Sequence, residues 1–99
     1  MIIGAAEVRL HLPAARSLKD KRQIVKSILS RVRNQYDVSA AEVGSQDKWQ
    51  LAELGLAYVS GDRPHANEVV SKAVDFIERG CGAQWNAEFL DYEFELLTF

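Results

Sequence analysis

The chain has 99 residues and a formal net charge of −2, and 47% of its residues are hydrophobic while 26% are charged. This composition excludes a disordered chain, and the length suits a single domain, residues 1–99. No apolar run approaches the roughly 20 residues that cross a bilayer. One cysteine, Cys81, excludes an internal disulfide and suits a reducing compartment. We therefore expect a soluble cytoplasmic domain with no membrane partner.

The first third of the chain predicts a strand followed by an amphipathic helix. From Ile2 to Leu12 apolar residues recur at every second position, which is typical of a strand with one buried face. From Leu18 the apolar spacing changes to that of a helix, which should end near Asn34. Ser17, with Asp20 three residues later, is expected to cap the start of this helix.

The middle of the chain predicts a β-hairpin. Residues Tyr36–Val43 and Trp49–Ser60 are rich in strand formers, and turn residues separate them. Both faces of the segment QLAELGLAYVS are apolar, so the pattern leaves open which face lies against the helices.

The last third predicts a helix and a final strand. Asp62 is a suitable N-cap, and Gly80 is expected to end the helix in a left-handed conformation. Residues Ala87–Leu97 then alternate, and the expected inward and outward sets are Leu90, Tyr92, Phe94 and Leu96 against Asp91, Glu93 and Glu95.

The predicted order is strand, helix, strand, strand, helix, strand. With right-handed crossovers, such a chain closes most simply as a ferredoxin-like βαββαβ sandwich of the α+β class. We expect a four-stranded antiparallel sheet with two helices on one face, in a single domain.

Three segments also resemble a known family. SLKDKRQIVKSILSRVRNQY, VSAAEVGSQDKWQLAELGLAYVS and VVSKAVDFIE are similar to the small bacterial YlxP-like family, a domain of unknown function. The resemblance implies a ferredoxin-like fold and a gene neighbourhood among translation and ribosome-maturation factors. It carries over no catalytic or binding residues.

A basic stripe is the most unusual feature of the sequence. Seven of the twelve basic residues lie between Arg16 and Arg33. On a helical wheel, four of them fall within about 60° of one another. These four are Lys19, Arg22, Lys26 and Arg33, which we call the basic stripe. Like charges at this spacing weaken an isolated helix slightly, so helix stability does not explain them.

Two functional interpretations remain open. In one, the basic stripe binds phosphates, and the protein is a non-enzymatic accessory protein associated with RNA or a ribosomal particle. In the other, the stripe is a solvated face that acids on the second helix (Glu68, Asp75 or Glu78) could bridge. The protein would then be a dimeric protein-interaction or ligand-sensing module, with its homodimer formed through the sheet.

Sequence patterns for catalysis, cofactors and metals are absent. There is no phosphate-binding glycine loop and no zinc-ligand spacing, and Cys81 is expected to be an inert thiol in a loop. Trp49 and Trp85 are expected to anchor the core or an interface. We therefore expect no enzyme activity, no catalytic residues, no cofactor, no metal and no DNA partner.

Overall fold

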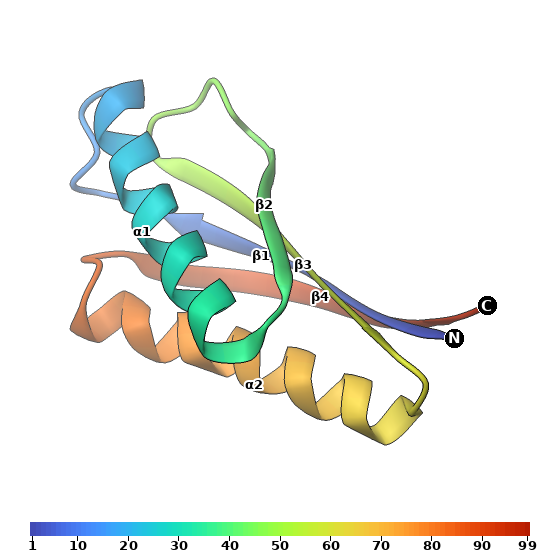
Figure 1. Cartoon of the computed structure of the whole chain (residues 1–99). Helices are drawn as coiled ribbons and strands as arrows, with labels where there is room; N and C mark the ends of the chain where they lie inside the picture. The colour runs from blue at the N-terminus through green and yellow to red at the C-terminus, as the bar shows by residue number, and fades with distance from the viewer.

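The structure, a computed structural model that describes residues 1–99, has the expected order of strands and helices (Figure 1). The elements are β1 (Ile2–His11), α1 (Leu18–Tyr36), β2 (Ser39–Gly44), β3 (Leu51–Ser60), α2 (Arg63–Ala83) and β4 (Glu88–Thr98). Neither helix is both long and apolar enough to cross a membrane.

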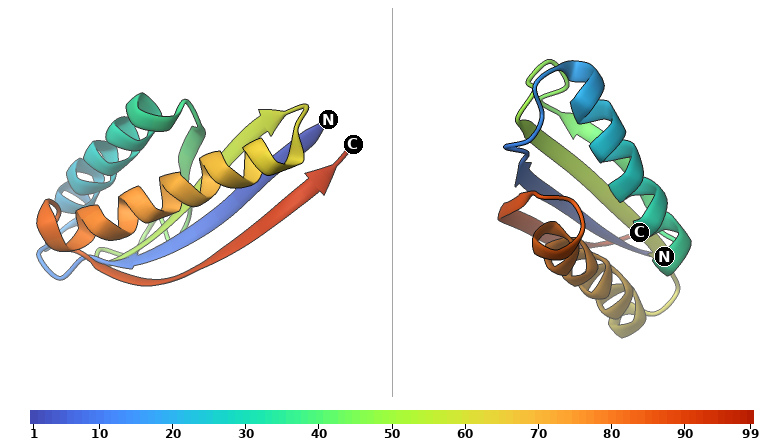
Figure 2. Two further views of the ribbon diagram at one scale, coloured as in Figure 1. Left: turned by 90° about the horizontal axis from the view of Figure 1, so that it is seen from below. Right: turned by 90° about the vertical axis from the view of Figure 1, so that its left-hand side faces the viewer.

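The four strands form one antiparallel sheet in the order β2-β3-β1-β4. Both helices cover the same face of this sheet, and the other face is open (Figures 1 and 2). α1 lies over β2, and α2 runs across β1, β3 and β4. This is the ferredoxin-like α+β sandwich that the order of predicted elements indicates.

The core lies between the helices and the sheet. On β3 the even-numbered residues face the helices, because the register places Ala52, Leu54 and Leu56 opposite the inward residues of β1. This pairing decides the face that the sequence left open. The largest fully buried apolar side chains of the core are Val8, Leu10, Leu12, Ile28, Val32, Leu54, Val70 and Ile77.

Both predicted N-terminal helix caps are confirmed. The Ser17 hydroxyl accepts a hydrogen bond from the Asp20 amide at 3.1 Å, and the Asp62 carboxylate accepts one from the His65 amide at 3.0 Å. These bonds satisfy amide donors that have no partner inside the helix.

The end of α1 and the start of the hairpin differ from the prediction. Tyr36, expected in a strand, is the last residue of α1, where its ring contacts Phe76 of α2 edge to face. Asp37 then adopts a left-handed conformation, with φ of 53°, and ends the helix. β2 begins only at Ser39.

The predicted end of α2 is wrong. Gly80 lies inside the helix, which continues to Ala83, so Cys81 is helical and buried rather than in a loop. The indole ring of Trp85 occupies the space where a Cβ of residue 80 would be. Gly80 is therefore needed for close packing of Trp85, not for a left-handed cap.

The predicted inward set of β4 is wrong at one position. The register between β1 and β4 shifts at Arg9/Leu10, so Phe89 rather than Leu90 lies opposite Leu10. Leu90 is therefore 51% exposed. A single bulge reverses the face of the residues before it, and simple alternation does not predict it.

Candidate nucleic-acid interface

The basic stripe lies on the solvent-exposed side of α1. All four of its residues are exposed, and none of the four takes part in an ion pair. The acids that could have neutralised it lie on α2, but Glu68 pairs with Lys72 of its own helix, and no ion pair joins α1 to α2. The stripe therefore presents its charge to solvent.

Arg33 differs from the other three residues of the stripe. Its guanidinium donates a hydrogen bond to the Ala40 carbonyl oxygen of β2, which is an edge strand. The bond occupies a backbone carbonyl group of the edge strand, which leaves fewer free groups for pairing with another chain. A guanidinium has five N–H donors, so Arg33 can hold β2 and still meet an anion.

A fifth cation of α1, Lys21, points inward. Its side chain is 1% exposed, its Nζ lies 2.8 Å from Glu42 Oε2, and it donates to the Ser45 carbonyl oxygen. The contact with Glu42 is an ion pair only. Its geometry is not that of a hydrogen bond, so the buried Oε2 atom of Glu42 has no hydrogen-bond partner. Sequence reasoning missed this pair, although Lys21 falls within the apolar side of the helical wheel.

The two tryptophans have different environments. Trp85 is 8% exposed and belongs to the core, as expected. Trp49 is 53% exposed and lies in the loop between β2 and β3, so it does not anchor the core, and an interface role for it stays a prediction.

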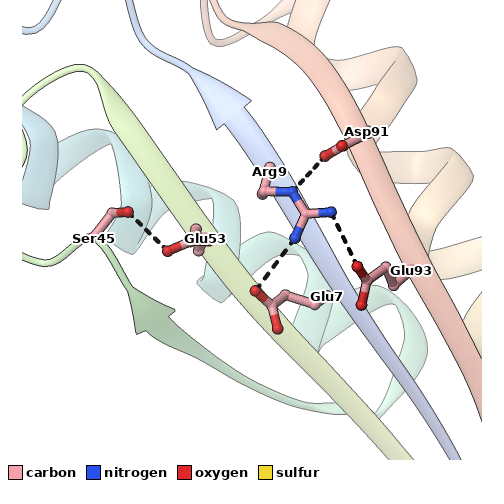
Figure 3. Close-up of polar contacts among 6 residues, drawn as sticks. All are labelled: Glu7, Arg9, Ser45, Glu53, Asp91 and Glu93. Carbon is pink, nitrogen blue, oxygen red and sulfur yellow. Dashed lines mark hydrogen bonds and ion pairs between the residues drawn. The ribbon is translucent and has the colours of Figure 1, made fainter.

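The acids of β4 meet a cation on the open face of the sheet. Arg9 of β1 lies between Asp91, Glu93 and Glu7, at 2.6, 3.4 and 3.6 Å (Figure 3). The hydrogen bond to Asp91 raises the pKa of the Arg9 guanidinium. These carboxylates are thus already paired with the Arg9 guanidinium. No cluster of three metal-ligating side chains is present.

An apolar, shallow groove lies beside these charges on the open face, which also carries Glu53 and Glu95. A groove of about 390 Å³ runs over β1, β2 and β3, and its floor is made of small residues. Val43 lies against Gly55 there, so close that a side chain at residue 55 would force Val43 to move. Val59, on the same face, is 60% exposed.

The thiol of Cys81 is not poised for chemistry. It is 2% exposed, and burial, assisted by the negative charge of Glu78, raises its pKa to about 11. A buried thiol with a raised pKa is a poor nucleophile.

Comparisons with known proteins agree with this architecture. Two designed proteins have the same fold: Foldit4, with a TM-score of 0.59 and 15% identity over 98% of both chains, and LFR1 1, described as having a ferredoxin fold, with a TM-score of 0.55 and 18% identity over 100% of this chain and 88% of that one. At these identities the likeness shows the fold alone. The chain thus has the ferredoxin-like α+β fold.

The family is also defined. The model of the family described as "Protein of unknown function (DUF503)" matches residues 3–93. The chain is 40% identical over 77 residues to the uncharacterized protein YlxP of Bacillus subtilis (strain 168), covering 78% of this chain and 84% of that protein. The chain belongs to the DUF503 family, as the resemblance implied.

Proposed function

We propose that this protein is a non-enzymatic RNA-binding accessory protein of the cytoplasm that associates with RNA or a ribosomal particle through the basic stripe of α1. The observation that carries the proposal is the exposure of Lys19, Arg22, Lys26 and Arg33 along one side of a helix, without a carboxylate partner.

The spacing of the stripe suits a phosphate backbone. Successive residues of the stripe are three, four and seven positions apart, so they span about 21 Å at 1.5 Å per residue. Each cation that meets a phosphate releases counterions, and this gain does not depend on base sequence. The opposite charge of the two parts of the chain adds support. Residues 1–33 carry eight basic and two acidic side chains, whereas residues 34–99 carry four basic and twelve acidic side chains.

RNA would bind on α1 rather than on the sheet. Domains of this topology that stack bases on their sheet need exposed aromatic residues in basic surroundings. Here the open face carries three carboxylates, Asp91, Glu93 and Glu7, around a single arginine. Their negative charges would repel phosphates. The gene neighbourhood implied by the family resemblance also favours a role in translation.

Crosslinking in cells, followed by sequencing of the bound RNA, tests the proposal. The test variant carries Lys19→Gln, Arg22→Gln and Lys26→Gln. The control variant removes the same charge from exposed cations elsewhere, by Arg31→Gln, Lys72→Gln and Arg79→Gln. Recovery of ribosomal or other RNA with the wild type and the control, but not with the test variant, is expected. No RNA with the wild type, or equal recovery with both variants, would reject the proposal.

The open sheet face favours a second candidate, a homodimeric interaction module with no nucleic-acid role. Val43 lines the groove of small residues and is 53% exposed, and Val59 and Leu97, both paired with Ile3 of β1, are 60% and 37% exposed. Exposed apolar patches commonly mark interfaces. Sedimentation equilibrium of the wild type and of Val59→Lys tests it. A dimer that this substitution dissociates, in a protein that binds no RNA, would favour this candidate over the first.

A further inference from the structure

We propose that Trp49 stacks on an unpaired base, so that the RNA bound at the start of the basic stripe is single-stranded. The inference rests on the proposed function, and it specifies the form of the ligand. It comes from the position of the loop between β2 and β3. The sequence predicts a strand from Trp49 onwards, whereas β3 begins at Leu51, so Trp49 lies in this loop.

The loop presents an aromatic ring to solvent. Trp49 is 53% exposed, whereas the other tryptophan is 8% exposed. Lys48, beside it, is also exposed, but Asp47 precedes it and offsets its charge. What this loop adds to the stripe is therefore an aromatic surface rather than further positive charge.

Hydrogen bonds hold both sides of the loop. On one side the Ser45 carbonyl oxygen accepts from the Lys48 amide at 3.0 Å and from the buried Lys21 side chain. On the other side the Gln50 side chain donates to the carbonyl oxygens of Pro13 and Ala15, at 3.3 and 3.2 Å. A ring on such a loop loses little conformational freedom on binding, which favours affinity.

The same bonds place the loop at the start of α1. Lys21 belongs to the first turns of the helix, between Lys19 and Arg22, and residues 13 and 15 lead into it. The views agree, because the green loop between β2 and β3 lies beside the blue start of α1 in Figure 1 and in the right-hand view of Figure 2. The aromatic residue and the basic stripe thus share one end of the molecule.

Other exposed aromatic residues lack this position. Tyr92 shares a groove with Asp75 and Glu78, whose charges disfavour a phosphate backbone. Phe99 lies at the C-terminus, hydrogen-bonded to Met1, at the far end of the sheet from the start of α1 (Figure 1). Of the three aromatic residues that are more than half exposed, Trp49 is therefore the one whose loop lies beside the start of the stripe.

Stacking distinguishes single-stranded from double-stranded RNA. A tryptophan can stack only on a base whose face is free, and bases inside an A-form helix are covered by their neighbours. Cations meet the phosphates of either form. The stripe alone would bind both forms, and Trp49 would add affinity only for unpaired bases.

Fluorescence and affinity measurements with two RNA ligands test the inference. The ligands are a single-stranded oligonucleotide of about 12 nucleotides and a blunt duplex of the same length. The proteins are the wild type, Trp49→Ala and Trp49→Phe, each checked for folding by circular dichroism. In Trp49→Phe the buried Trp85 is the only indole, so any quenching lost in this variant belongs to Trp49.

Single-stranded RNA should quench the wild-type emission and leave that of Trp49→Phe unchanged. Trp49→Ala should weaken single-strand binding by about 5- to 160-fold and change duplex binding by less than about 2-fold. Unchanged single-strand affinity in Trp49→Ala, or an equal loss for both ligands, would overturn the inference but leave the stripe in place. Absence of binding to either ligand by the wild type at low salt would instead overturn the proposed function.

Discussion

Lys21 Nζ lies 2.8 Å from Glu42 Oε2, and this ion pair joins α1 to β2 in the interior of the protein. Lys21 is 1% exposed, and it also holds the Ser45 carbonyl oxygen. Lys21 and Glu42 both lie in segments that carry the family resemblance, SLKDKRQIVKSILSRVRNQY and VSAAEVGSQDKWQLAELGLAYVS. The physical role of both residues is to fix the hairpin beside the start of α1.

Removing Lys21 should destabilise the protein strongly. Lys21→Ala leaves the Glu42 carboxylate, whose side chain is 19% exposed, without a counterion, and breaking a buried pair costs about 3–5 kcal/mol. Urea unfolding followed by circular dichroism measures the loss. Lys19→Ala, which removes an exposed and unpaired lysine of the same helix, should change the free energy of unfolding by no more than about 0.5 kcal/mol.

A double substitution separates charge from packing at this site. Lys21→Met combined with Glu42→Leu removes both charges and keeps most of the volume, so it should recover much of the loss. If Lys21→Ala were no more destabilising than Lys19→Ala, the ion pair would not hold the hairpin as described.

Two glycines of α2 should respond in opposite ways to the same substitution. Gly80→Ala should destabilise the protein by about 1–3 kcal/mol, because its Cβ would clash with the ring of Trp85. Gly82→Ala should stabilise it by about 0.5–1 kcal/mol, because nothing lies within 4 Å of the added Cβ and alanine is the better helix former. Thermal unfolding of both variants checks the pair, and a stabilising Gly80→Ala would contradict the packing of Trp85.

The buried thiol of Cys81 should make stability fall at high pH. Its pKa is about 11 in the folded protein against an ordinary value of 9.0, so above pH 9 the unfolded chain loses the proton while the folded chain keeps it. The contribution of the buried thiol to the free energy of unfolding is fully present below pH 9 and is lost by about pH 11. It amounts to about 2–3 kcal/mol, at 1.36 kcal/mol per pKa unit.

The difference between the wild type and Cys81→Ala isolates this effect, because other groups that titrate near pH 10 cancel. The free energy of unfolding of the wild type relative to the variant should fall between pH 9 and pH 11. A difference that stays constant over this range would mean that the thiol is not protected by burial.

The fold could be predicted because local signals agree with one another. The Ser17 and Asp62 caps and the alternation of β1 each match the structure. The errors occur where tertiary packing overrides a local rule. Gly80 looked like a helix end but makes room for Trp85, and Leu90 looked buried but lies at a bulge.

The exposure of the basic stripe followed from the helical wheel, but its surroundings did not. The wheel also places Lys21 on the apolar side of the helix, but its partner Glu42 lies 21 positions later, and the place of Trp49 depends on bonds from Gln50 to residues 13 and 15. Contacts between segments that are distant in sequence leave no periodic signal along the chain. Such contacts become visible only when the hairpin is placed against the helix.

The salt dependence of RNA binding tests the basic stripe most directly. For a single-stranded RNA whose phosphates meet all four cations, the logarithm of the association constant should fall with the logarithm of salt concentration at a slope of about −2.8. Lys19→Gln/Arg22→Gln/Lys26→Gln should reduce the slope to about −0.7, and Arg31→Gln/Lys72→Gln/Arg79→Gln should leave it unchanged. A slope near zero for the wild type, or the same slope in all three proteins, would contradict the assignment of the stripe as the RNA-binding surface.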